Sequence, residues 1–265
     1  MSDVYRIYEG SSPLLVSVPH DGRDIPAAIA RHMTAAGKAI PDTDWHVAKL
    51  YDFVRDTGAS LLVANVSRYV IDLNRSENDD VLYPGQLVTG LCPVRTFAGE
   101  HIYGGQYQPD DKEKADRIAR YWRPYHDRIR AALGRLVELH GYALLWDAHS
   151  IPSRVPTIFE GELPVLNVGT NDGRSCDPAL QEQVAEVAAA SGLESVVNGR
   201  FKGGYITRHY GAPKNDVHAI QLEIAQRAYM DETSGRYVAD SAARLQKTLA
   251  AMLDAFTIQA AFRQR

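Results

Sequence analysis

Apolar residues along the chain gather in short runs that alternate with stretches of helical spacing. The runs have the length and composition of strands that are buried on both faces of a sheet. Such strands are typical of parallel or mixed sheets, whose two faces are covered by helices. Six are predicted, over residues 14–18, 60–66, 143–146, 165–169, 194–197 and 219–224.

Apolar positions at helical spacing predict four helices, one of which is interrupted. Pro124 lies inside the longest of them, where a proline removes a backbone hydrogen bond and causes a kink or a break. Asp177, Pro178 and Gly192 supply an N-cap, a proline at the first helical position and a glycine after the end. The predicted helices cover residues 43–54, 111–141, 177–192 and 235–261.

The alternation of strands and helices predicts an α/β sandwich with helices on both faces of the sheet, in one domain that spans residues 1–265. Residues 78–111 interrupt this alternation, because they are rich in glycine and proline and show little periodicity. Loops of this length in compact domains are usually functional. Their many apolar and aromatic residues argue against disorder, so we expect a loop that covers the site.

Composition and charge are those of an ordinary globular protein. Of the 265 residues 45% are hydrophobic and 23% are charged, and a net charge of −4 without a basic stripe argues against a nucleic-acid partner. Cys92 and Cys176 lack the spacing of a metal site, which favours structural thiols. There is neither a signal-peptide pattern nor an apolar run of the about 20 residues that cross a bilayer, so we expect a soluble, cytoplasmic protein without a membrane partner.

Three of the predicted strands lead to side chains that can bind a metal ion. These side chains are His20, Asp147, His149 and Glu223. Open α/β sheets bind ligands beyond the carboxyl ends of their strands, so we expect these groups at one rim. Two histidines and a carboxylate are typical ligands of catalytic zinc. Asp147 could orient His149 without binding the metal itself. The alternative for His20 is a loop histidine that caps a turn.

Residue chemistry leaves the third metal ligand open among Asp44, Asp21 and His46. Asp44 lies in the first turn of the predicted 43–54 helix, where the helix dipole alone favours a carboxylate. His46 is two residues further on and faces another way on a helix. Asp21 adjoins His20 but would need an awkward turn to share its metal. The three candidates therefore rank close together.

Glu223 is a candidate general base, because it lies inside an apolar strand where an unpaired carboxylate is costly. Burial raises a carboxylate pKa towards the range in which it can accept a proton from water and return it to a leaving amine. A structural ion pair or a solvent-facing position at the strand end is the alternative.

Two polar segments could bind an anionic substrate. In residues 65–75, Arg68 and Arg75 offer planar guanidinium groups that suit carboxylates, although surface ion pairs would explain them too. In residues 202–211, Arg208 and His209 are candidates for binding or for transition-state stabilisation, unless the segment is simply a turn. The roles of His209 and of His101 stay open, and the glycine spacing excludes a nucleotide-binding loop.

Together these motifs resemble the N-formylglutamate amidohydrolase family over nearly the whole chain. The resemblance rests on residues 18–22, 43–47, 67–75, 146–150, 204–211 and 220–224. It implies a zinc-dependent hydrolase that cleaves N-formyl-L-glutamate to formate and L-glutamate in histidine degradation. It also implies a three-layer α/β/α sandwich with a mixed central sheet, similar to that of the zinc carboxypeptidases.

The resemblance further implies a role for each candidate. The carboxypeptidase His-x-x-Glu pattern is not met, because Arg23 occupies the place of the glutamate, and this departure favours Asp44 as the middle zinc ligand. Glu223 resembles the strand-end glutamate that serves as the base, and our own hypothesis adds that Arg208 helps to stabilise the oxyanion. The implied zinc ligands are His20, Asp44 and His149, and Asn74 with Arg75 resembles the pair that binds the substrate carboxylate in carboxypeptidases. We expect Arg68 and Tyr205 to bind the substrate as well.

Two other functions fit the same residues. The first is a zinc deacylase of the same fold that acts on another N-acyl amino acid or a peptide-like amide. The second is a non-catalytic binder of acidic metabolites, in which His20 and His149 contact the ligand without a metal. A His/carboxylate site also leaves room for iron, manganese or cobalt in place of zinc.

Overall fold

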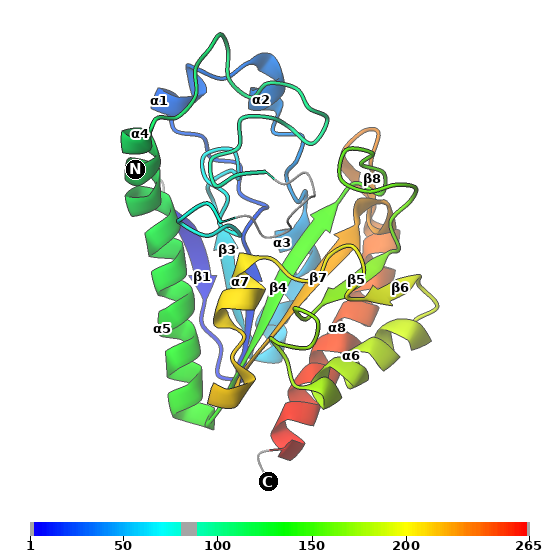
Figure 1. Cartoon of the computed structure of the whole chain (residues 1–265). Helices are drawn as coiled ribbons and strands as arrows, with labels where there is room; N and C mark the ends of the chain where they lie inside the picture. The colour runs from blue at the N-terminus through cyan, green and yellow to red at the C-terminus, as the bar shows by residue number, and fades with distance from the viewer. Residues whose placement is uncertain (1–2, 81–88, 264–265) are drawn as a thin grey trace.

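Within residues 3–80 and 89–263, which the computed structural model describes, seven strands form one central sheet in the order β1-β3-β2-β4-β7-β5-β6 (Figure 1). Neighbouring strands β3, β2, β4 and β7 are parallel, whereas β1 and β5 run antiparallel to β3 and β7. The sheet is therefore mixed. The strands are Tyr5–Tyr8 (β1), Leu14–Val18 (β2), Ser60–Ala64 (β3), Ala143–Ile151 (β4), Leu166–Gly169 (β5), Ser195–Val197 (β6) and Val217–Ala225 (β7).

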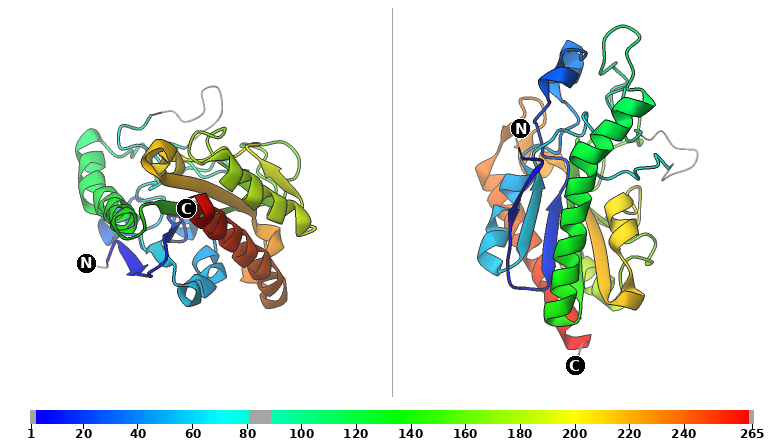
Figure 2. Two further views of the ribbon diagram at one scale, coloured as in Figure 1. Left: turned by 90° about the horizontal axis from the view of Figure 1, so that it is seen from below. Right: turned by 90° about the vertical axis from the view of Figure 1, so that its left-hand side faces the viewer.

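Helices cover both faces of the sheet, which confirms the predicted three-layer α/β/α sandwich (Figure 2). One apolar core packs α3, α6 and α8 against the sheet, and the other packs α5 and α7 against the opposite face. The helices are Ala27–Ala30 (α1), Ala35–Ala39 (α2), Val47–Leu50 (α3), Asp111–Arg117 (α4), Arg123–His140 (α5), Pro178–Ala190 (α6), Tyr205–Tyr210 (α7) and Ala239–Arg263 (α8). A small hairpin joins Met230–Asp231 (β8) to Arg236–Tyr237 (β9).

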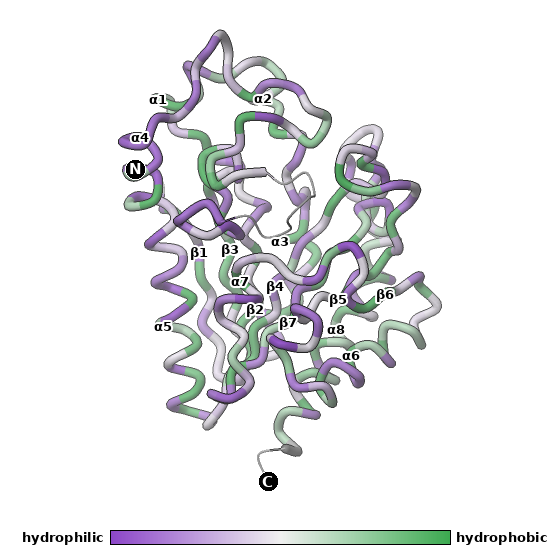
Figure 3. The backbone as a smooth tube through the Cα atoms, viewed as in Figure 1, coloured by the Kyte–Doolittle hydropathy of each residue, from purple (hydrophilic) through white to green (hydrophobic). Residues whose placement is uncertain are grey.

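The twofold alternation of β4 separates its packing side chains from its polar ones. Leu144, Trp146 and Ala148 belong to the core under α6 and α8. Successive strand residues point to opposite faces, so Asp147 and His149 emerge on the face of α5 and α7. Helix α5 separates its side chains in a similar way, but with the period of a helix. Hydrophilic and hydrophobic stretches alternate along it, as expected of a helix with one face on the sheet (Figure 3).

Strand β7 repeats this alternation beside β4. Ile220 and Leu222 are buried in the α6/α8 core, and Gln221 and Glu223 point to the other face. The parallel register pairs Glu223 with His149. Two side chains that are 74 positions apart in the chain are therefore neighbours because of the strand pairing.

All six predicted strands form, but β4 and the first predicted helix differ from expectation. β4 continues to Ile151, so His149 lies within the strand rather than beyond its end. The helix predicted over residues 43–54 is wrong. Only Val47–Leu50 is α-helical, His46 before it has a left-handed φ of 66°, and Asp52–Thr57 forms a 3-10 helix. Asp44 thus precedes the helix instead of lying in its first turn.

The helix predicted over residues 111–141 is confirmed, and its interruption is a π-helical turn. α4 continues through the π turn Ile118–Trp122 into α5, and Pro124 occupies the start of α5. Gly141, with a φ of 79°, ends the helix. The helix therefore continues past Pro124 without a break, because the π turn precedes the proline.

Residues 78–80 and 89–110 of the long loop contain isolated bridges, such as Arg95 to His101, but no strand or helix. Residues 81–88 lie outside the described ranges. Strand β1 was not predicted, because its exposed edge position gives it alternating exposed residues rather than an apolar run. In the ranges that the structure covers, no helix combines the length and the apolarity needed to cross a membrane.

Candidate active site

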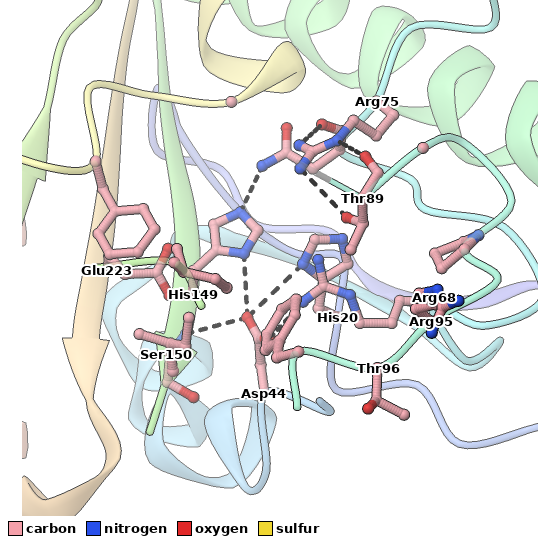
Figure 4. Close-up of a pocket in the computed structure, with 18 of the residues that line it drawn as sticks. His20, Asp44, Arg68, Arg75, Thr89, Arg95, Thr96, His149, Ser150 and Glu223 are labelled. Atoms are coloured by element: carbon pink, nitrogen blue, oxygen red, sulfur yellow. Dashed lines mark hydrogen bonds and ion pairs between the residues drawn. The ribbon is translucent and has the colours of Figure 1, made fainter. Parts of the chain in front are cut away.

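A cavity of about 260 Å³ opens near the carboxyl ends of β4 and β7 (Figure 4). This is the rim at which open α/β sheets bind ligands. Residues of the long loop, among them Thr89, Pro93 and Phe97, form part of its wall. It gathers most of the side chains singled out in the sequence. Those that line it are His20, Asp44, Arg68, Asn74, Arg75, His149 and Glu223.

Three of these side chains form a cluster that can hold a metal ion. His20, Asp44 and His149 are buried, and each offers one ligand atom within 4.8 Å of the others. Asp44 Oδ2 lies 3.1 Å from His149 Nδ1 and 3.9 Å from His20 Nδ1. Figure 4 shows the Asp44 carboxylate facing both imidazole rings, with a dashed line to each. Two imidazoles and a carboxylate are the donor set of many catalytic zinc sites.

The outer nitrogen of each histidine is held by a buried carboxylate. His20 Nε2 lies 2.7 Å from Asp72 Oδ1, and His149 Nε2 lies 3.0 Å from Asp147 Oδ2. In His20, an Nε2–H that donates to Asp72 leaves the Nδ1 lone pair on the side of Asp44. In His149, Nε2 faces both Asp147 and the side-chain amide of Asn74, whose Nδ2 lies 2.9 Å away. This carboxylate–histidine arrangement orients metal-binding imidazoles. The residues present therefore fit a metal ion.

The charges around the cluster also favour a cation at its centre. Burial opposes ionisation of Asp72, but His20 and Arg68 outweigh it and hold the pKa of Asp72 well below its usual range. Burial likewise opposes protonation of His149, but Asp147 and Asp44 raise its pKa well above its ordinary value. The carboxylates thus stabilise a positive charge between them, whether it is a proton on His149 or a metal ion.

Asp44 is fixed in this position by backbone hydrogen bonds rather than by a helix. Its amide donates to the carbonyl of His20 over 3.1 Å, and its Oδ2 accepts from the amide of Ser150 over 3.0 Å. Its Oδ1 lies 3.5 Å from Arg68 Nη1. The turn at residues 40–46 therefore brings the carboxylate to the two histidines.

The other two candidates for the third ligand lie elsewhere. Asp21 Oδ2 accepts from the amide of Ala48 over 2.9 Å, and its Oδ1 pairs with Arg23. His46 Nε2 lies 2.9 Å from the carbonyl of Gly235. Neither lines the cavity, so within the described residues the geometry favours Asp44 over both.

Glu223 lines the cavity next to His149 and is buried. Burial raises the pKa of its carboxyl group to about 8, although the neighbouring His149 opposes the shift. A cation bound by the cluster of His20, Asp44 and His149 would lower the pKa of Glu223. Gln221 Nε2 donates to Glu223 Oε2 over 3.3 Å and fixes the side chain. Glu223 is therefore placed to accept and return a proton.

Arg68 and Asn74 line the cavity but are bound mainly to the protein itself. Arg68 donates to Asp72 Oδ2 over 2.9 Å, and its guanidinium is buried. Asn74 Nδ2 donates to Asp147 Oδ2 over 3.2 Å, while Asn74 Oδ1 accepts from the amide of Ile206 over 2.8 Å. These contacts favour orientation of the histidine-binding carboxylates over the direct substrate contact that was expected.

Two arginines of the cavity were not singled out in the sequence. Arg95, from the long loop, and Arg200, from the connection between β6 and α7, line the cavity together with Arg75. Phe97 and Phe201 add apolar surface. Arg95 and Arg200 lie in irregular segments far apart in the chain, so no pattern in the sequence could have associated them with the site.

The remaining candidates are not among the described residues that line the cavity. Arg208 Nε donates to the carbonyl of Gly203 over 2.7 Å, and the expected contact with the oxyanion finds no support in this position. Tyr205 stacks on His209, with ring centroids 4.8 Å apart. His101 is exposed, and its carbonyl accepts from a threonine of the neighbouring loop.

Comparison with known proteins agrees with this arrangement. Residues 12–230 match the profile of a family described as N-formylglutamate amidohydrolase. The chain belongs to the N-formylglutamate amidohydrolase family. The N-formylglutamate deformylase of Pseudomonas putida is 48% identical over 257 residues, which cover 96% of each chain. The corresponding protein of Pseudomonas aeruginosa is 47% identical over 256 residues, again with 96% of each chain covered.

Solved structures of this fold include another protein of the N-formylglutamate amidohydrolase family. The enzyme of that name from Ralstonia eutropha superimposes with a TM-score of 0.82 at 25% identity and covers 98% of this chain and 99% of its own. A gene product of Agrobacterium tumefaciens, 17% identical, superimposes with a TM-score of 0.72 over 96% of each chain and shows the shared fold.

Gly204 of this family member is expected to tolerate no side chain. A Cβ there would lie 2.3 Å from Asn74 Nδ2, and the Asn74 amide is fixed by its bonds to Ile206 and Asp147. Gly204→Ala should therefore lower the free energy of unfolding by roughly 1–3 kcal/mol and displace Asn74. Gly134→Ala is the control, because an added Cβ meets nothing within 4 Å on α5 and should stabilise the helix. Equal thermal midpoints for Gly204→Ala and the parent would refute the expectation.

Proposed function

We propose that this chain is a zinc-dependent N-formylglutamate deformylase, which hydrolyses N-formyl-L-glutamate to formate and L-glutamate as a step of histidine degradation. The observation that carries the proposal is the buried cluster of His20, Asp44 and His149 with Glu223 beside it in one cavity. The identity of 48% to the deformylase of Pseudomonas putida supports the choice of substrate.

The residues of the cavity can carry out the hydrolysis of a linear amide. A bound divalent ion supplies Lewis acidity, which lowers the pKa of water and polarises a carbonyl group. Glu223 accepts a proton from the water whose oxygen forms a bond to the formyl carbon. The bond between that carbon and the amide nitrogen then breaks, and Glu223 returns the proton to the leaving amine of glutamate.

The arginines of the cavity supply the charge that a dicarboxylate needs. Arg75 donates through Nε to the carbonyl of Thr89 over 2.8 Å, through Nη1 to the carbonyl of Asn74 over 3.2 Å and through Nη2 to Thr89 Oγ1 over 3.4 Å. These bonds fix the guanidinium at the cavity wall. We assign Arg75 to one carboxylate of the substrate, and Arg95 with Arg200 to the other. Phe97 and Phe201 offer apolar surface for the methylene groups between the two carboxylates.

The proposal predicts a preference for doubly charged N-formyl substrates. N-formylglutamate should have a higher kcat/KM than N-formylglutamine, and Arg75→Gln should lower kcat/KM for N-formylglutamate by about 10- to 100-fold, as expected for a lost hydrogen bond to a charged group. Arg55→Gln is the matched control, because Arg55 forms an exposed ion pair with Asp52 on a distant surface. Formate release measures the rates.

Rates with further N-acyl substrates distinguish an N-formylglutamate deformylase from a related deacylase. N-acetylglutamate and N-succinylglutamate are included beside the formyl substrates. Faster turnover of either would identify a deacylase of different acyl selectivity, and equal kcat/KM values for N-formylglutamate and N-formylglutamine would contradict recognition of the second carboxylate.

A further inference from the structure

Residues 70–75 carry three groups of the site and yet form no helix or strand. Asp72 holds the imidazole of His20, Asn74 contacts the His149 ring, with Nδ2 2.9 Å from its Nε2, and Arg75 lines the cavity. A segment without regular hydrogen bonds must satisfy its buried carbonyl groups in other ways. The position of these three side chains therefore depends on what binds the carbonyls of residues 70–75.

One continuous helix, from α4 through the π turn to α5, binds three of those carbonyls. Arg117 Nη1, His126 Nε2 and Trp122 Nε1 each lie 2.9 Å from a carbonyl oxygen of the segment. All three side chains are almost completely buried. The acceptors, in the same order, are Val70, Leu73 and Arg75.

The π turn explains how one helix can present all three side chains to the same segment. In an α-helix, Arg117 and Trp122 would be five residues and therefore about 140° apart around the axis. The π turn Ile118–Trp122 contains an additional residue, which removes most of this offset. His126 follows Trp122 by four residues and so lies on the same helix face.

The rings of His126 and Trp122 are both held in a fixed orientation. Burial lowers the pKa of His126 to about 3, so the imidazole is neutral. Because the carbonyl of Leu73 can only accept, Nε2 carries the proton, and Nδ1 accepts from the hydroxyl of Tyr210 over 2.9 Å. The Trp122 ring stacks on His126, with centroids 3.7 Å apart and an angle of 24° between the planes.

We propose that Trp122 and His126, presented by the π turn, are positioning residues that set the place of Asn74 and Arg75 in the cavity. Neither ring lines the cavity, so they act through the backbone of residues 70–75. The inference rests on the proposed function only for the identity of the substrate. Its structural part, the restraint of residues 70–75 by the helix, is independent of any activity.

Trp122→Phe tests the proposal, because phenylalanine keeps an aromatic ring against His126 but cannot donate to the carbonyl of Arg75. Trp146→Phe is the matched control. Its indole is equally buried and donates to the hydroxyl of Tyr51 over 3.0 Å, in the other core. Hydrogen exchange of the peptide that spans residues 70–75, the thermal midpoint, and KM and kcat for N-formylglutamate are measured on the full chain.

We expect Trp122→Phe to speed exchange in residues 70–75 and to raise KM by about tenfold with a smaller change in kcat, because a displaced Arg75 binds the substrate carboxylate more weakly. Trp146→Phe should lower the thermal midpoint and leave both readouts unchanged. Unchanged exchange in residues 70–75 of Trp122→Phe would overturn the proposal. His126→Leu provides the same test if Trp122→Phe cannot be purified. A parent protein without turnover of N-formylglutamate would contradict the proposed function alone, since the exchange comparison still decides the inference.

Discussion

Replacement of Glu223 by glutamine is expected to lower kcat for N-formylglutamate by about 10³-fold, the usual contribution of a positioned general acid–base group. Glutamine has nearly the same shape, but its amide cannot accept a proton from water. The side chain lies in the cavity beside His149 and outside the group of residues that can hold the metal. The variant should therefore retain the metal and a KM close to that of the parent.

Gln221→Glu is an unsuitable control, because Gln221 itself contacts Glu223 and Asn74. Glu232→Gln is better matched, since this carboxylate caps the amide of Ser153 away from the cavity. Steady-state formate release and metal content are measured on both variants. Near-normal turnover by Glu223→Gln with metal bound would show that another group accepts the proton.

Replacement of Asp44 by alanine is expected to remove the metal and with it the activity. Loss of a residue that merely supports a ligand lowers metal affinity 10- to 100-fold, so loss of a direct ligand should lower it by more than about 100-fold. Asp44 also accepts from the amide of Ser150 and lies near Arg68, so the variant should be less stable as well. Metal content after dialysis measures the first effect and thermal unfolding the second.

Asp21→Ala separates these two effects. Asp21 is a buried carboxylate that accepts from the amide of Ala48, so its loss should also destabilise the chain. It lies outside the cluster of His20, Asp44 and His149, so the metal should stay bound. Full metal occupancy in Asp44→Ala, or loss of metal only in Asp21→Ala, would exclude Asp44 as the third ligand.

The strands of the fold could be predicted from the sequence, whereas some local structure could not. Apolar runs identify buried strands, because a strand inside the sheet needs apolar side chains on both faces. β1 has no apolar run, because it lies at the edge of the sheet and its exposed residues alternate with half-buried ones. The spacing of residues 43–54 suits a helix, but hydrogen bonds of Asp44 to residues distant in the chain override that preference.

The site was predictable only where a side chain is tied to a strand or a recognisable motif. His149 and Glu223 belong to such strands, and the register of β4 and β7 makes them neighbours. Asp72 lies in the polar segment of residues 65–75, but the sequence does not reveal its contact with His20, because this contact depends on how the segment folds. Arg95 comes from a loop without periodicity, so only the three-dimensional structure reveals its place in the cavity.

The central claim is that the cluster of His20, Asp44 and His149 supports metal-dependent hydrolysis of N-formylglutamate. Formate release by the purified chain, before chelation, after chelation and after return of zinc, tests it most directly. The expected result is turnover that disappears with the chelator and reappears with zinc, in proportion to the metal bound. Undiminished formate release from verified metal-free protein, or no release with any divalent metal, would contradict the claim.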